Sequence, residues 1–250
     1  MPVTQLVAML RGTAPQHAAG VLLAMPTDRV NAVLTAMQPA DIARLLSGMK
    51  AGQRNTVLSM LTIEQIIGVL RTMPVEHAAG LLAGMPKERI VEVIDGLPPK
   101  AVPVLMEAMP PEFRAALLDE MDPYQADGTM STMYQRGVAQ ALGRTNVQIT
   151  YPNGEQDPTL LVQTFERLIV VAICYHDDGA LSQREIRTAE DTAAWMRANG
   201  TLVVTNAQLT QEAIGYRSEA RSRERLVDVV TWLDPRHDGA LQRALVSLVR

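Results

Sequence analysis

The hydrophobic positions of residues 2–121 recur with a period of twelve. The unit PKERIVEVIDGL at residues 86–97 shows the pattern plainly, and other units tend to be apolar at the same fifth, eighth, ninth and twelfth positions. In this unit those positions are Ile90, Val93, Ile94 and Leu97. The spacing i, i+3, i+4, i+7 places four side chains along one face of a short helix. Residues 2–121 are therefore predicted to form a series of short amphipathic helices.

Proline opens many of these units, and it fits both the start of one helix and the end of the helix before it. The opening prolines include Pro26, Pro74, Pro86, Pro98 and Pro110. A proline costs nothing in the first helical turn, and it disfavours helix in the preceding residue. Helices of about ten residues are not stable alone, so the apolar faces must be buried by stacking. We predict an α-solenoid of about ten short helices over residues 1–122.

One unit interrupts the regular pattern, and two histidines recur at one position of it. In the unit KAGQRNTVLSML at residues 50–61, Arg54 takes the fifth position and the opening proline is missing. We expect the stem of Arg54 to run along the edge of the core, with its guanidinium turned outward. His17 and His77 both take the fourth position of their units, sixty residues apart. They are expected to be surface residues rather than a pair of metal ligands.

The pattern changes after residue 121. Residues 123–129 are rich in polar and turn-forming types and are predicted to be a linker. Beyond them, helical and strand patterns alternate. Helices are expected at 130–144, 183–198, 210–225 and 239–249, and strands at 147–150, 160–163, 168–175, 201–205 and 227–233. This alternation predicts an α/β layer architecture for residues 130–250.

The repeat half resembles the cytosolic N-domain of MgtE-type magnesium channels. The resemblance rests on short helices separated by proline and on the phrases HAAGVLLAM at residues 17–25 and HAAGLLAGM at residues 77–85. It implies a helical superhelix. The nucleotide-type regulatory domains and the membrane pore of those channels have no counterpart in these 250 residues. The resemblance therefore implies an architecture and does not imply magnesium gating.

The second half resembles a restriction-endonuclease-like domain of the Mrr type. The segment RANGTLVVTNAQLTQEA at residues 197–213 is similar to that family's strand and its T-x-x-x-x-T-x-E-A turn into a helix. An opening helix, a strand, an Asn-Gly turn and two further strands precede it in the order that the family shows. The resemblance places the first metal-binding carboxylate at Asp157 and the (E/Q)-x-K triplet on Ile173-Cys174-Tyr175.

This sequence departs sharply from the triplet. Neither Ile173 nor Tyr175 supplies a polar metal ligand or a lysine that polarises the attacking water. Residues 101–250 contain no lysine that might replace it. Asp157 is either a relic of the catalytic aspartate or a solvated turn residue before Pro158, and we favour the turn. We expect no catalytic residues, no bound metal and no cofactor.

Arg217, Arg221, Arg223 and Arg225 form the basic cluster of the second half. They are the candidates for nucleic-acid contact. Glu219 and Glu224 interrupt the cluster, which is more typical of a salt-bridged helix face than of a phosphate-binding track.

Two His-Asp-rich strings, at residues 176–179 and 237–239, have metal-ligand types but end in glycine after apolar stretches. We interpret them as turns. Cys174 lies in an apolar strand and is expected to be an inert core thiol. No phosphate-binding loop, dinucleotide motif, zinc spacing or nucleophile elbow occurs.

The composition is that of an ordinary soluble protein, with 47% hydrophobic and 20% charged residues and a net charge of −4. This charge argues against a strongly electrostatic nucleic-acid binder. A single cysteine excludes an intramolecular disulfide, and the longest apolar run, at residues 168–175, is too short to cross a bilayer. No signal peptide is apparent. We expect a cytoplasmic bacterial protein without a membrane partner.

These observations favour a non-catalytic adaptor or scaffold. The solenoid would bind a protein partner, and the degenerate nuclease domain would serve dimerisation or weak nucleic-acid contact. One alternative is a DNA-binding protein or metal-dependent nuclease of a defence or DNA-processing system, with an atypical site at Asp157. Another is a structural subunit that assembles with its own copies through the solenoid, as a homo-oligomer.

Overall fold

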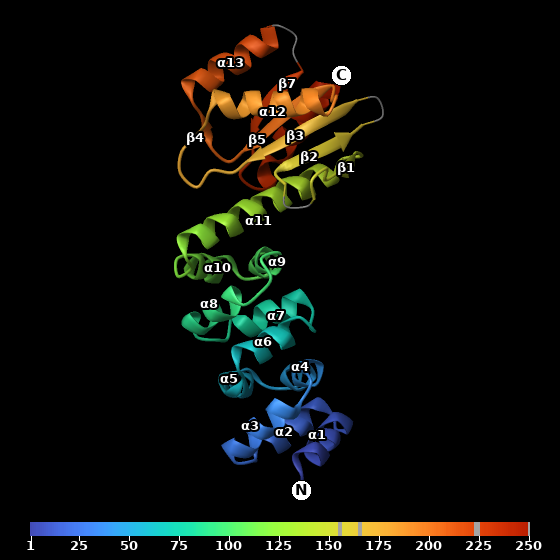
Figure 1. Ribbon diagram of the computed structural model, residues 1–250, viewed down its shortest axis with the longest axis vertical. Helices are drawn as coiled ribbons and strands as arrows, with labels where there is room; N and C mark the ends of the chain where they lie inside the picture. The colour runs from blue at the N-terminus through green and yellow to red at the C-terminus, as the bar shows by residue number, and fades with distance from the viewer. Residues whose placement is uncertain (155–156, 165–166, 223–225, 250) are drawn as a thin grey trace. The chain divides into compact units, whose positions relative to one another are not determined.

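A computed structural model describes residues 1–154, 157–164, 167–222 and 226–249, with the backbone alone at 221 and 222. The chain divides into two compact units, Met1–Ala126 and Asp127–Arg250. We call them the repeat unit and the α/β unit (Figure 1). The division falls inside the segment 123–129 that the sequence analysis expects to be a linker.

The repeat unit consists of short helices that follow the twelve-residue period. They are α1 (Val3–Gly12), α2 (Pro15–Leu23), α3 (Thr27–Ala36), α4 (Pro39–Ser47), α5 (Ala51–Met60), α6 (Ile63–Leu70), α7 (Val75–Leu82), α8 (Lys87–Asp95), α9 (Ala101–Glu107) and α10 (Pro111–Leu118). The predicted run of about ten short helices is confirmed.

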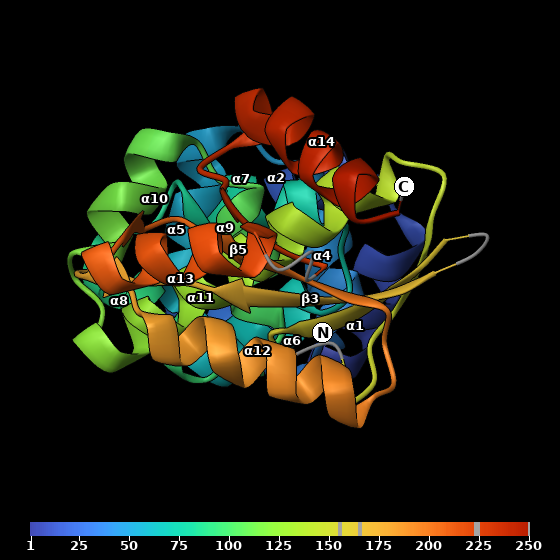
Figure 2. The same cartoon turned by 90° about the horizontal axis from the view of Figure 1, so that it is seen from above.

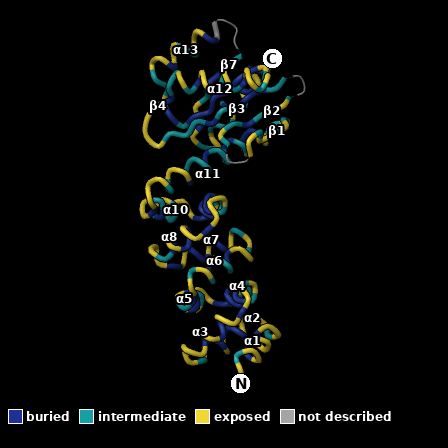
Figure 3. The backbone as a smooth tube through the Cα atoms, viewed as in Figure 1, coloured by how far each residue is buried: buried dark blue, intermediate teal, exposed yellow. Residues whose placement is uncertain are grey.

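The apolar face of these helices is buried between alternate members of the series. Helix α1 packs on α3, α2 on α4, α4 on α6, α6 on α8 and α7 on α9. In α8 the stripe residues Ile90, Val93 and Ile94 are at most 2% exposed. Figure 3 shows exposed and buried positions side by side along these helices. Each helix is therefore stabilised by its neighbours rather than by its own length.

The segment 123–129, expected to be a linker, is helical and opens α11 (Pro123–Gly143). The carboxylate of Asp122 accepts hydrogen bonds from the backbone N–H groups of Tyr124, at 3.0 Å, and Gln125, at 3.4 Å. Pro123 has a backbone φ suited to the first helical position. Capping by Asp122 and the proline start thus favour helix over the turn-forming composition of the segment.

The α/β unit is built on a five-stranded sheet with the order β1-β2-β3-β5-β7. Its strands are β1 (Gln148–Thr150), β2 (Thr159–Gln163), β3 (Leu168–Cys174), β5 (Gly200–Thr205) and β7 (Val227–Thr231). Strands β1, β2 and β3 pair antiparallel, whereas β3, β5 and β7 pair parallel. The short strands β4 (Ala180–Leu181) and β6 (Gln208–Leu209) form a separate parallel pair.

Helices cover both faces of this sheet, as the sequence pattern predicts. The end of α11 within this unit and α14 (Asp238–Val249) pack on one face, together with Trp232. Helices α12 (Gln183–Trp195) and α13 (Gln211–Ser222) cover the other face. Figure 2 shows α12 and α14 on opposite sides of β3. A 3₁₀ turn, η1 (Pro235–His237), precedes α14. In the described part of the chain, no helix is both long enough and apolar enough to cross a membrane.

Candidate functional site

The sheet register brings together the two segments that the sequence analysis singled out. Asp157 precedes β2, and the backbone N–H of Ile173 donates to the carbonyl of Pro158 at 2.8 Å. Thr159 of β2 pairs with Ala172 of β3. Asp157 therefore lies beside the triplet Ile173-Cys174-Tyr175, at the end of the sheet where β2 begins and β3 ends.

Asp157 is held in the turn that follows β1. Its carboxylate accepts hydrogen bonds from the side chain of Asn153, at 2.9 Å, and the backbone N–H of Thr159, at 2.8 Å. Burial acts to raise the pKa of Asp157, but these hydrogen bonds outweigh burial and lower that pKa below its usual value. Gly154 has a φ of +98°, which suits the turn. The contacts of Asp157 are thus those of a turn residue.

Of the two outer triplet positions, Ile173 points into the core, and Tyr175 is partly buried and packs against that core. Ile173 is 4% exposed and belongs to the cluster beneath α11 and α14. The ring of Tyr175 lies 5.6 Å from that of Tyr134, and the Tyr134 ring lies 5.5 Å from Trp232. We call Tyr134, Tyr175 and Trp232 the aromatic cluster. It lies on the face where the resemblance would place a metal ligand and a lysine.

Hydrogen bonds fix the aromatic cluster in place. The hydroxyl of Tyr134 donates to the backbone carbonyl of Trp232 at 2.8 Å, and Trp232 Nε1 donates to Asp238 Oδ1 at 2.9 Å. Gly137 allows the indole to approach α11, because a Cβ at this position would lie 2.7 Å from Trp232 Cη2. Burial raises the pKa of both Tyr134 and Tyr175, so both hydroxyls stay protonated near neutral pH.

On the opposite face of β3, polar side chains cap α12. Glu185 accepts hydrogen bonds from the backbone N–H of Ser182, at 2.8 Å, and from its hydroxyl, at 2.7 Å. His176 Nε2 lies 3.1 Å from the other carboxylate oxygen of Glu185. Burial, and secondly the charge of Glu185, raise the pKa of Cys174 to about 11. A thiol with such a pKa is mostly protonated and is a poor nucleophile at neutral pH.

The His-Asp-rich strings do not assemble a metal site. Asp177 and Asp178 are exposed. In the second string, His237 Nδ1 lies 3.4 Å from Asp234, in the turn before α14. In the described part of the chain, no group of three or more His, Cys, Asp or Glu side chains is placed to hold a metal ion.

Arg217 forms an ion pair with a buried residue of the α/β unit. Its guanidinium lies 3.0 Å from Asp228 of β7, which is 7% exposed. This arginine is therefore engaged with the protein itself. The side chain of Arg221 and the whole of Arg223 and Arg225 lie outside the described residues.

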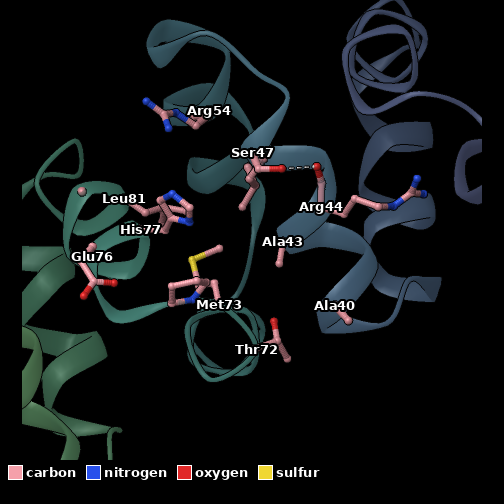
Figure 4. A pocket seen from close by; sticks show the side chains of 13 residues that line it. Ala40, Ala43, Arg44, Ser47, Arg54, Thr72, Met73, Glu76, His77 and Leu81 are labelled. Carbon is pink, nitrogen blue, oxygen red and sulfur yellow. Dashed lines mark hydrogen bonds between the residues drawn. The ribbon is translucent and has the colours of Figure 1, made fainter.

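A pocket of about 580 Å³ lies in the repeat unit, and the sequence analysis did not anticipate it. Its walls come from α4, α5, α7 and the residues before α7, as Figure 4 shows. Arg44, Arg54 and His77 line it together with apolar residues such as Ala43 and Leu81. His77 is exposed, and so is His17 on α2, as predicted. We call this cavity the Arg54 pocket.

The Arg54 pocket lies where the apolar stripe is broken. The residues at the fifth position of other units, Val30, Ile42, Ile66 and Ile90, are at most 2% exposed. Arg54 takes this position in α5 and is half-buried. Helix α5 packs less closely on α3 and α7 than most helices of the unit pack on their second neighbours. The arginine in the stripe was the sequence signal that could have located this pocket.

Comparison with known proteins supports the predicted resemblance of the repeats. Residues 37–133, which is less than half of the chain, match the family model of the MgtE intracellular N domain. The resemblance to this family is confirmed over these residues, which extend from the end of α3 into α11. The match ends at residue 133, so it does not test the endonuclease-like resemblance of the α/β unit.

One solved structure with partial similarity is the cytosolic domain of the Mg²⁺ channel MgtE in complex with ATP. The two sequences are 16% identical, the alignment covers 72% of this chain and 88% of that chain, and the TM-score is 0.40. No curated protein matches the chain.

Proposed function

We propose that this protein is a non-catalytic adaptor of the cytosol. Its repeat unit binds a protein partner, and its α/β unit is a degenerate restriction-endonuclease-like domain that serves dimerisation or weak nucleic-acid contact. The observation that carries the proposal is the aromatic cluster. It fills with Tyr134, Tyr175 and Trp232 the face on which such a nuclease would hold its metal ligand and its lysine.

The order of elements supports the endonuclease-like assignment. An opening helix α11, strand β1, the turn containing Asn153-Gly154, and strands β2 and β3 precede β5. After β5, a short segment that includes β6 leads into α13. This is the order that the Mrr-type resemblance implies, and the short distance along the sheet between Asp157 and the triplet supports it.

The chemistry of the same region supports the loss of catalysis. Metal-dependent hydrolysis of a phosphodiester needs carboxylates that fix the metal and a group that activates water. Asp157 uses its carboxylate to accept hydrogen bonds within its own turn. Ile173 is apolar, and Tyr175 has a raised pKa that keeps it protonated at neutral pH. Among the described residues, the two outer triplet positions therefore supply neither a second carboxylate nor a base.

The repeat unit supplies the binding surface in this proposal. Arrays of stacked helices expose long surfaces to solvent and commonly bind proteins. The family match over residues 37–133 to the MgtE intracellular N domain supports a binding or regulatory role for this unit. The Arg54 pocket provides a preformed concave feature on it.

The catalytic part of the proposal is tested by incubating the purified full chain with supercoiled plasmid and Mg²⁺ or Mn²⁺. We expect no nicking, and the Asp157→Ala variant should behave in the same way. Metal-dependent nicking that disappears in Asp157→Ala would overturn the pseudo-enzyme assignment and support the nuclease alternative.

The binding part is tested by photo-crosslinking of the full chain in the native cytosol. Benzoylphenylalanine replaces Ala40, which is exposed and lines the Arg54 pocket, or Gln140, which is exposed on α11 in the α/β unit. We expect discrete protein adducts from position 40. Adducts from neither position, or from position 140 alone, would contradict a partner-binding repeat unit.

A further inference from the structure

The Arg54 pocket contains a half-buried guanidinium without a partner. Among the described residues, the side chain of Arg54 takes part in no hydrogen bond or ion pair. A charged group that loses part of its hydration without gaining a partner is unfavourable, so burial of Arg54 has a free-energy cost. In most equivalent positions the chain places buried aliphatic residues, whereas Arg114 takes this position in α10. The arginine is therefore poorly explained by stability and is well placed to receive an anionic group.

The positively charged or basic groups that line the pocket outnumber the carboxylates. Arg44 donates to two backbone carbonyls, those of Leu10 and Thr13, at 3.0 and 3.2 Å, and no carboxylate neutralises it there. Glu76 also lines the pocket, but Figure 4 shows it apart from Arg54, with His77 between them. The pocket thus contains two guanidinium groups and an imidazole against one carboxylate.

The wall next to these charges is apolar. Ala43, Leu46 and Leu81 line the pocket and are at most 8% exposed as residues, so only limited parts of them reach its surface. Met73 and Pro74 extend this wall. A ligand that fits both parts carries a carboxylate close to an aliphatic side chain. At about 580 Å³ the pocket has room for a few side chains of a peptide.

These features favour a peptide over a nucleic acid. No phenylalanine, tyrosine or tryptophan lines the pocket to offer a large ring on which a base could stack. The repeat unit has twelve acidic and ten basic residues, so it lacks the excess of positive charge that a phosphate backbone needs. A carboxylate, in contrast, matches the planar fork of one guanidinium and forms two charge-assisted hydrogen bonds with it.

We propose that the Arg54 pocket binds an acidic peptide segment of the partner protein, with an aspartate or glutamate on Arg54 and an adjacent aliphatic side chain on the wall of Ala43, Leu46 and Leu81. This inference rests on the proposed adaptor function and specifies the site and the chemistry of its partner.

The test uses the full chain and a displayed library of random linear peptides. We expect enrichment of peptides in which an acidic residue is next to an aliphatic one. Each enriched peptide is then synthesised with a fluorescein label, and its binding is measured by fluorescence anisotropy. Replacing its acidic residue by the corresponding amide should weaken binding at least about tenfold, the order expected for loss of a charge-assisted hydrogen bond.

Variants of the protein locate the binding site. Arg54→Gln should weaken binding at least about tenfold, and Arg54→Lys should lose less because it retains the charge. Arg114→Gln is the matched control, since Arg114 takes the same fifth position in α10, is half-buried and does not line the Arg54 pocket. Circular dichroism melting of each variant shows whether the fold is retained. If Arg54→Gln unfolds the repeat unit, His77→Ala and Leu81→Met take its place, and both should weaken binding.

The outcomes separate this inference from the adaptor function. Peptides that bind equally well to the wild type and the Arg54→Gln variant would overturn the pocket assignment and leave the adaptor function standing. Enriched peptides without acidic residues would overturn the proposed chemistry. A fluorescein-labelled single-stranded oligonucleotide that binds in an Arg54-dependent way, when peptides do not, would also overturn it. Failure to enrich any peptide, together with failure of crosslinking at position 40, would count against the adaptor function itself.

Discussion

Removal of one hydroxyl from the aromatic cluster tests whether this cluster stabilises the α/β unit. Tyr134→Phe keeps the ring, with its contacts at 5.6 Å to Tyr175 and 5.5 Å to Trp232, and deletes the hydrogen bond of 2.8 Å to the Trp232 carbonyl. Tyr134 is 8% exposed, so water does not readily replace the lost donor. A buried acceptor that loses its partner costs about 1–3 kcal/mol. We expect the unfolding free energy to fall by this amount.

Tryptophan fluorescence during urea unfolding of the full chain measures this change. Both tryptophans lie in the α/β unit, so the signal reports on that unit alone. Trp232 is 5% exposed and Trp195 is 80% exposed, so the change on unfolding comes mainly from Trp232. The background variant Trp195→Phe removes the remaining contribution. Because burial raises the pKa of Tyr134, its hydroxyl stays protonated, and the loss should be constant from about pH 6 to about pH 9.

Tyr151→Phe serves as the control, since Tyr151 is 37% exposed and makes no ring contact with the cluster. Its unfolding free energy should change by no more than about 0.5 kcal/mol, the range of neutral surface substitutions. If Tyr134→Phe and Tyr151→Phe unfold at the same urea concentration with the same slope, the hydrogen bond does not contribute as argued. The aromatic cluster would then be a consequence of packing and not a determinant of stability.

Two further predictions concern the repeat unit and the cysteine. Ile94→Ala should destabilise the repeat unit by about 2–5 kcal/mol, because Ile94 is 2% exposed. Glu92→Ala, at an exposed position of the same helix, should change the stability little. Equal melting midpoints of the two variants, measured by circular dichroism, would mean that the stripe is not buried as described. Cys174 should resist iodoacetamide at neutral pH until the chain is denatured, because burial and the charge of Glu185 raise the pKa of its thiol to about 11. Rapid labelling of the native protein, detected by mass spectrometry, would contradict this prediction.

Predictions from the sequence were least accurate where local and compositional signals disagree. Residues 123–129 read as a linker by composition, yet they form the first turns of α11. Their helix depends on the capping contacts of Asp122, which involve only two or three residues. A capping residue followed by proline is visible in the sequence, and in this case it was a better guide than the abundance of turn-forming residues.

The sequence by itself determined the elements whose signal is periodic. The twelve-residue stripe predicted buried positions such as Ile90 and Val93, because a helix places residues three and four apart on one face regardless of its surroundings. The apolar run of β3 predicted a strand covered on both sides for the same kind of local reason. The sequence also predicted that the triplet of β3 lacks nuclease chemistry.

Only the tertiary structure decided what surrounds these positions. Tyr134 and Trp232 are 98 residues apart, and their contact depends on how α11 and the end of β7 pack over one face of the sheet. The Arg54 pocket likewise depends on the packing of α4, α5 and α7, although Arg54 itself was visible as a break in the stripe. Periodicity predicts which face of a helix or strand is buried, but it does not predict which other element packs against that face. That choice depends on the fit of side chains from distant parts of the chain, and it forms only when the layers pack.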